Sequence, residues 1–115
     1  MLRAVWNGIV LAEAPRTVRI EGNHYFPPDS VHSEYFAKSR TKTLCPWKGL
    51  AGYYNLTTER GDALDVAWYY AHPSPLARRI KNHVAFYPEV RIEGESEPRP
   101  GGGLRSRLSG RTKAS

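Results

Sequence analysis

One short stretch of this chain gathers residue types that do chemistry together: Cys45-Pro46-Trp47-Lys48-Gly49. Cys45 is the only cysteine, and its thiol would act as a nucleophile only as the thiolate, which needs a nearby positive charge or a base. Lys48 could supply the charge if the segment folds back, and His24 could supply the base if the fold brings it near. The alternative is a buried thiol that behaves as a small apolar side chain, which is the commoner fate of a free cysteine.

Lys48 is followed by Gly49, where the backbone can turn sharply and approach a ligand closely. A lysine beside exposed backbone amides and Trp47 suits a phosphate or carboxylate group, with the indole ring taking a base or another planar group. The alternative is a solvated surface lysine. The chain has neither a Gly-x-x-x-x-Gly-Lys-Ser/Thr loop nor a Gly-rich dinucleotide fingerprint, so no familiar nucleotide-binding fold is indicated.

The residue spacing indicates neither a metal site nor a particular cofactor. The four histidines lack metal-ligand spacing, and a single cysteine disfavours a structural zinc site. Asp62 and Asp65 lie near an expected turn, which predicts solvated carboxylates rather than metal ligands. His24 is the histidine of interest, because the segment from Asn23 to Pro27 must form a defined irregular loop before its prolines.

Regularly spaced turn signals predict that short strands position these residues. Asn7-Gly8 between the apolar runs Leu2 to Trp6 and Ile9 to Glu13 is the strongest local hairpin signal. Turns are expected at 22–23 and 59–62, and short helices over 31–37 and 76–82. Further strands are expected over residues 17–21, 41–45, 50–58, 64–71, 84–87 and 90–93.

Together these elements predict one all-β, mainly antiparallel domain over residues 1–95, a small barrel or rolled sandwich with two short helical segments. The chain of 115 residues is long enough for one domain with a modest core. One cysteine excludes an intrachain disulfide. No apolar run resembles a signal peptide or a membrane span, so we expect a cytoplasmic protein without a membrane partner.

Aromatic residues make up 11% of the chain and are concentrated in runs such as Tyr53-Tyr54 and Trp68-Tyr69-Tyr70. Because adjacent strand residues point to opposite faces, each run divides between the interior and the outside. Core and cross-strand packing is the first explanation. An inward Tyr53 or Tyr70 could also line a ligand pocket.

The net charge of +6 belongs mostly to the C-terminal end of the chain. Residues 96–115 carry five basic side chains against Glu97, a net of +4, which leaves +2 for the other 95 residues. Prolines and three consecutive glycines cannot bury apolar surface, so residues 96–115 are expected to form a disordered basic tail. Such a tail would bind nucleic acid or other polyanions without specificity, or remain a solvated extension.

Five motifs occur here in the order used by one family: Trp6-Asn7-Gly8, Glu21 to Pro27, Cys45 to Gly49, Ala67 to Tyr70 and Val84 to Tyr87. Over residues 3 to about 93 the chain resembles the small bacterial and fungal family known as domain of unknown function 427. The resemblance implies a compact, mainly β fold, and the family is sometimes labelled nucleotidyltransferase-like. It matches positions without assigning them roles; these are Cys45, Trp47, Lys48, His24, Tyr25, Trp68 and Tyr70.

Two functions fit these residues. The first is a domain that binds, or transforms, a small anionic or nucleotide-like ligand. The residues proposed to contact that ligand are Trp47, Lys48, Gly49, Tyr25, Tyr53, Trp68 and Tyr70. In an enzyme, Cys45 would be the nucleophile, His24 the base and Lys48 the group that stabilises developing negative charge. The second is a non-catalytic interaction module with an aromatic partner surface, whose basic tail tethers it to polyanions.

Overall fold

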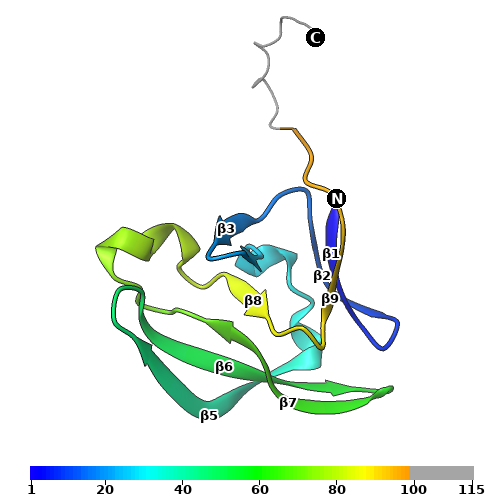
Figure 1. The fold of residues 1–115 in the computed structure, drawn as a ribbon. Helices are drawn as coiled ribbons and strands as arrows, with labels where there is room; N and C mark the ends of the chain where they lie inside the picture. The colour runs from blue at the N-terminus through cyan, green and yellow to red at the C-terminus, as the bar shows by residue number, and fades with distance from the viewer. Residues whose placement is uncertain (99–115) are drawn as a thin grey trace, which may run out of the picture.

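The computed structural model describes residues 1–98, whose strands form three antiparallel sheets (Figure 1). The predicted all-β, mainly antiparallel fold is confirmed, although the sheets do not close into a barrel. The first sheet has the order β2-β1-β9 and the second pairs β3 with β4, while the third has the order β5-β6-β7-β8. The strands are β1 (Leu2–Trp6), β2 (Ile9–Ala14), β3 (Val18–Ile20), β4 (Asn23–Tyr25), β5 (Phe36–Cys45), β6 (Gly49–Thr58), β7 (Gly61–Tyr69), β8 (Val84–Phe86) and β9 (Arg91–Gly94).

Instead of the two predicted helical segments, residues 1–98 contain three short 3₁₀ turns and no α-helix. The helix predicted over 31–37 is wrong, because Val31 pairs with Ala12 and the His32 amide donates to the Leu11 carbonyl at 2.8 Å, which ties the segment to β2. Phe36 already begins β5, so that strand is ten residues long and starts well before the predicted 41–45. The 3₁₀ elements are η1 (Pro28–Ser30), η2 (Ser33–Tyr35) and η3 (Pro75–Ile80), which replaces the helix predicted over 76–82.

Two tight turns of the same backbone geometry shape the N-terminal half. The predicted hairpin at Asn7-Gly8 is confirmed, with φ of 49° and 79° at its two central residues. Glu21 and Gly22 repeat this geometry with φ of 55° and 81° and join β3 to β4. This second turn lies one residue before the predicted 22–23, and β4 itself was not predicted.

The core consists of two clusters that meet around β8. One fills the space between the first and third sheets, and Phe26 lies at its centre with no exposed surface. Phe26 also exchanges backbone hydrogen bonds with Val84 at 2.8 and 2.9 Å, which joins the end of β4 to β8. The second cluster lies under β3, β4 and η3 and contains Tyr25, Tyr53, Tyr70 and Ile80. It carries most of the aromatic residues that the sequence marked as site candidates.

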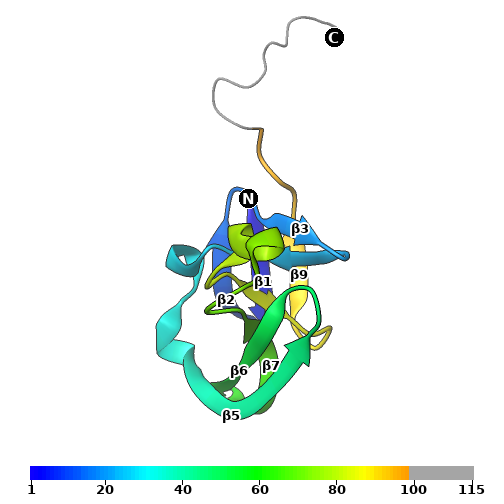
Figure 2. The ribbon, with the colours of Figure 1, turned by 90° about the vertical axis from the view of Figure 1, so that its left-hand side faces the viewer.

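The N-terminus lies beside the last strand, as Figures 1 and 2 show. Its ammonium donates to the Glu95 carbonyl at 2.8 Å and pairs with the Glu97 carboxylate at 3.0 Å. The Glu97 amide donates to the Pro15 carbonyl at 2.8 Å. Residues 99–115 of the expected tail lie outside the described residues. Within residues 1–98, no helix is long and apolar enough to cross a membrane.

Gly52 on β6 allows the buried Tyr69 ring of β7 to lie directly against the backbone. A Cβ at Gly52 would come within 2.5 Å of that ring. The Tyr54 ring also packs against the Tyr69 ring, with the two centroids 4.6 Å apart. We expect Gly52→Ala to lower the free energy of unfolding by about 1–3 kcal/mol, as overpacking does in closely packed sites. Urea denaturation measures this, and Leu50→Ala, at a position 55% exposed, is the control. Equal losses of unfolding free energy in Gly52→Ala and Leu50→Ala would contradict the close packing of Gly52 against Tyr69.

Candidate functional site

The stretch Cys45 to Gly49 forms the turn between β5 and β6, with Cys45 and Gly49 as its closing pair. Gly49 has φ of +115°, a backbone conformation that residues with a Cβ rarely adopt. Ser74, just before η3, fixes the turn from outside: its amide donates to the Lys48 carbonyl at 2.9 Å and its hydroxyl to the Trp47 carbonyl at 2.5 Å. Figures 1 and 2 show the turn lying against η3.

Lys48 points inward from this turn, and its side chain is only 6% exposed. Its ammonium lies 4.9 Å from the centroid of the Trp47 ring and 5.9 Å from that of Tyr70. The Glu21 carboxylate forms an ion pair with it. Burial by itself lowers the pKa of Lys48, but the hydrogen bond to Glu21 and the nearby phenol and thiol outweigh it and raise the pKa above its usual value. The lysine is therefore a buried, charged group and not a solvated one.

Glu21 comes from the β3–β4 turn, far from Lys48 in sequence. Its side chain is 52% exposed, and its second oxygen accepts a hydrogen bond from Trp47 Nε1 at 3.4 Å. The hydrogen bond from Lys48, and then that from Trp47, hold the pKa of Glu21 below its usual value. Sequence reasoning missed this residue. The signal that could have found it is a glutamate directly before a turn glycine, where asparagine is favoured.

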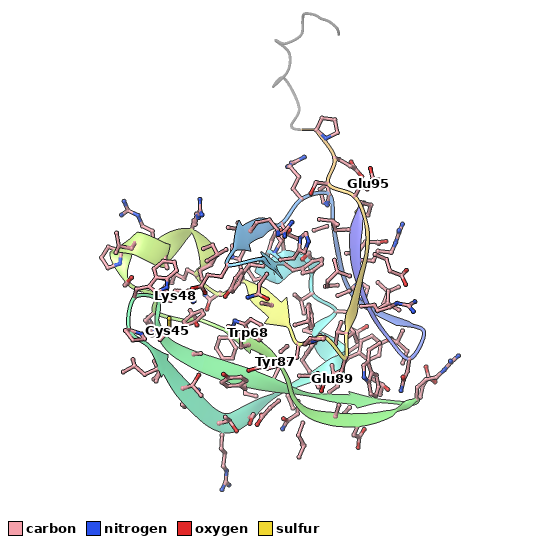
Figure 3. The ribbon with its side chains drawn as sticks, viewed as in Figure 1. Cys45, Lys48, Trp68, Tyr87, Glu89 and Glu95 are labelled. Atoms are coloured by element: carbon pink, nitrogen blue, oxygen red, sulfur yellow. The ribbon has the colours of Figure 1, made fainter. Side chains whose placement is uncertain are left out.

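The Cys45 thiol is half-buried against the second core cluster, beside Lys48 (Figure 3). Burial raises the pKa of the thiol, but the backbone amides of Lys48 and Trp47 and the Lys48 ammonium outweigh that effect, so the pKa lies below its ordinary value. The turn thus aims positive charge and N–H groups at one point, which is the environment that stabilises any small anion.

A cavity of about 260 Å³ adjoins Lys48 and contains most of the predicted ligand-contacting residues. The Trp68 indole donates to the Tyr25 hydroxyl at 3.1 Å, and the Tyr53 hydroxyl bonds to Thr43 at 2.8 Å. Figure 3 shows Trp68 and Tyr87 along the path from Lys48 toward the middle of the molecule. The lining residues are Glu21, Asn23, Tyr25, Lys48, Tyr53, Trp68, Tyr70 and Tyr87.

Two of these phenols hold their protons firmly. Burial raises the pKa of Tyr70 to about 12, and the hydrogen bond with Tyr53, followed by burial, raises that of Tyr87 to about 12. At neutral pH both hydroxyls therefore keep their protons, and that of Tyr87 donates to the Tyr53 hydroxyl at 3.5 Å. The cavity wall thus combines the Lys48 ammonium and these hydroxyls with the Glu21 carboxylate and several flat ring surfaces.

His24 lies on the opposite face of β4 from the cavity. Its neighbours Asn23 and Tyr25 line the cavity, and alternation along the strand turns His24 away. Its Nδ1 lies 2.6 Å from the Thr17 hydroxyl, and burial, then Arg19, lowers its pKa. The structure therefore does not bring His24 to Cys45.

A second cavity in the described chain is lined by none of the predicted site residues. It is larger, about 580 Å³, and lies along the segment from Glu13 to Val18 and against η1. Among residues 1–98, no group of three or more His, Cys, Asp or Glu side chains could hold a metal ion. The Asp65 carboxylate accepts a hydrogen bond from Thr41 at 2.7 Å.

The lowered pKa of Cys45 predicts a measurable change in reactivity. The rate of alkylation against pH should have its midpoint below that of an ordinary thiol, about 8.5. Lys48→Met should raise the midpoint, because the thiolate loses a stabilising charge. Lys81→Met, at an exposed position, should leave it unchanged. A wild-type midpoint at the ordinary value would contradict the proposed electrostatics.

The Glu21–Lys48 pair predicts a pH dependence of stability in acid. Because the pKa of Glu21 is lowered by folding, its contribution is present above the unfolded pKa and is lost as the pH falls through the lower folded value. Urea midpoints of wild type and Glu21→Gln should therefore differ near neutral pH and converge below about pH 4. A difference that stays constant across this range would show that the carboxylate's charge is not involved.

Comparison with known proteins agrees with the motifs found in the sequence. No curated protein matches the chain. The model of one protein family, described as Domain of unknown function (DUF427), matches residues 1–97. That range includes every strand, the turn from Cys45 to Gly49, Glu21 and the whole cavity wall. The chain is therefore a member of the DUF427 family.

Proposed function

We propose that the chain binds a small anionic ligand with a planar, nucleotide-like part, in the cavity beside the turn from Cys45 to Gly49. Lys48 would bind the anionic group, and the rings of the cavity wall would hold the planar part. The single observation that carries the proposal is the Lys48 ammonium, which is almost fully buried in the wall of an open cavity.

A buried ammonium is costly unless another group compensates its charge. In a purely structural role, a buried acidic residue from the core would be the expected partner. Here the partner, Glu21, reaches in from an exposed turn, and both side chains line the cavity. A lysine fixed in this way supports binding of an anion from solvent.

The cavity wall supports a planar group next to that anion. Tyr25 and Trp68 pack edge to face with ring centroids 6.3 Å apart, and Tyr53 stacks on Tyr87 at 6.4 Å. Flat rings of this kind stack on bases and other planar groups with little preference for sequence. The volume of about 260 Å³ favours a single ring system with one anionic group over a dinucleotide.

The cavity wall supplies contacts for binding, whereas transformation of the ligand would also need a nucleophile and a base. Cys45 has the lowered pKa that a nucleophile needs. Among residues 1–98, however, no histidine lines the cavity. A catalytic role for Cys45 would therefore depend on Lys48 for charge stabilisation and on the ligand or solvent for proton transfer.

A second function, an interaction module, is favoured by an apolar pair outside the cavity. Leu44 and Leu50 are cross-strand partners next to the turn and are 74% and 55% exposed. They would present an apolar surface to a protein partner, with the basic residues beyond 98 as the tether to polyanions. Replacing both leucines by threonine should abolish such an interaction and leave anion binding intact, which separates the two functions.

The anion site predicts a thermal shift that depends on Lys48. Inorganic pyrophosphate or a nucleoside monophosphate should raise the melting temperature of the wild type, whereas the uncharged nucleoside should have a smaller effect. Lys48→Met should weaken binding by about tenfold or more, because a charge-assisted hydrogen bond is lost. Tyr70→Phe should weaken it less.

Lys81→Met, which removes an exposed lysine near η3, is the matched control and should retain the full shift. The quantity compared is the ligand-induced shift of each variant, so that differences in intrinsic stability cancel. Equal shifts for Lys48→Met and wild type across the panel would remove Lys48 as the anion site.

A further inference from the structure

We infer that Glu21 acts as an internal substitute for the anionic group of the ligand. Its carboxylate occupies the anion subsite formed by Lys48 and Trp47, and a ligand with a carboxylate or phosphate group binds by displacing it. This inference rests on the proposed function. It adds that Glu21 competes with the ligand for the subsite, so that only ligands able to displace the carboxylate bind there.

The two tight turns of the chain provide the first argument. Asn7-Gly8 and Glu21-Gly22 have nearly the same φ angles at both central positions. Asparagine tolerates the positive φ of the first position, whereas glutamate pays a conformational cost there. Residues held in unfavourable backbone conformations concentrate at functional sites. Among the non-glycine residues of 1–98 with positive φ, Glu21 alone is neither asparagine nor aspartate, and its side chain is the one that reaches Lys48.

The donors that hold Glu21 provide the second argument. Lys48 Nζ bonds to one carboxylate oxygen and Trp47 Nε1 to the other. Two donors on two oxygens of one planar group would serve a carboxylate or an edge of a phosphate from another molecule equally well. The pairing of Glu21 with this subsite therefore shows the chemistry that the subsite accepts.

The exposure of the two partners shows which of them can leave. Lys48 is 6% exposed and fixed by its surroundings, whereas Glu21 is 52% exposed at the tip of a turn. Rotation of the glutamate side chain into solvent would return its charge to water and uncover little apolar surface. Movement of the lysine would leave a void among aromatic rings. Displacement therefore acts on Glu21.

Tyr70 is a donor that residues 1–98 do not use. It lines the cavity and is only 5% exposed, and within residues 1–98 its hydroxyl has no hydrogen-bond partner. Its ring lies next to the Lys48 ammonium. The hydroxyl is reached from the cavity, and an incoming anion at Lys48 would give it an acceptor. Glu21 satisfies Lys48 and Trp47 but leaves Tyr70 to the ligand.

The single cysteine beside Lys48 allows this to be tested in the intact chain. Iodoacetate carries a carboxylate and iodoacetamide does not, so the ratio of their rates with Cys45 reports the preference of the site for an anion. Glu21→Gln should raise this ratio by about threefold to tenfold, the range expected when a partly exposed charged competitor is removed. Glu93→Gln removes a carboxylate from another exposed ion pair, on β9, and should leave the ratio unchanged. Lys48→Met should lower it.

A second measurement separates displacement from a general change in electric field. Inorganic pyrophosphate should protect Cys45 from iodoacetamide in a saturable manner, with a half-protecting concentration lower in Glu21→Gln than in wild type by a similar factor. If pyrophosphate protects Cys45 but iodoacetate is not preferred over iodoacetamide, the subsite accepts phosphate. If iodoacetate is preferred but pyrophosphate does not protect, the subsite accepts carboxylate. Both outcomes support displacement provided that the effect depends on Glu21.

Failure of the inference about Glu21 and failure of the anion site itself give different results. If Lys48→Met lowers the iodoacetate ratio or removes protection, but Glu21→Gln matches wild type in both measurements, the inference about Glu21 is overturned and the anion site stands. If Lys48→Met changes neither measurement, whether or not Glu21 is also replaced, the anion site itself is overturned and the inference falls with it.

Discussion

The buried ammonium of Lys48 is the constraint on which this site depends. A positive charge with so little exposure must be compensated, and Glu21 provides the compensation from another hairpin. This requirement fixes the position of the β3–β4 turn relative to the β5–β6 turn, because a displaced hairpin would leave the charge unpaired. Ser74 holds the lysine's own turn from a third direction. Three segments far apart in sequence thus converge at the turn that carries Lys48.

The second core cluster both fills the interior under β3, β4 and η3 and lines the cavity beside Lys48, and its composition follows from these two roles. A core of leucine and isoleucine would fill the same space more simply, but it would leave no donors near Lys48. Tyrosine and tryptophan bury large apolar surfaces while placing hydroxyl and indole groups at the cavity wall. The partial network of Tyr25, Trp68, Tyr53 and Thr43 satisfies most of these groups internally. The remaining capacity faces the cavity, where the proposed ligand would use it.

Local sequence signals predicted the parts of the fold that depend on local chemistry. The Asn7-Gly8 hairpin and most strand positions follow from turn residues and alternation, and so does the placement of Lys48 in a turn. Longer-range pairing decided the rest. The sequence predicts a helix over residues 31–37, yet Val31 and His32 bond to β2 and Phe36 already begins β5. The phase of β4, which a two-residue turn sets, directs His24 away from Cys45. The unusual glutamate before Gly22 could have marked Glu21 as a site residue, but no local pattern reveals that its partner lies 27 residues away.

One positive charge limits what the turn from Cys45 to Gly49 can do at once. Lys48 stabilises the Cys45 thiolate, pairs with Glu21 and, in the proposed function, binds the ligand's anionic group. These three anions compete for the same ammonium, so an anion bound at Lys48 weakens the stabilisation of the thiolate. A nucleophilic Cys45 and a tightly bound anion therefore oppose each other unless the anionic group is itself the point of attack. This competition is a physical reason to place ligand binding ahead of thiol chemistry in this site.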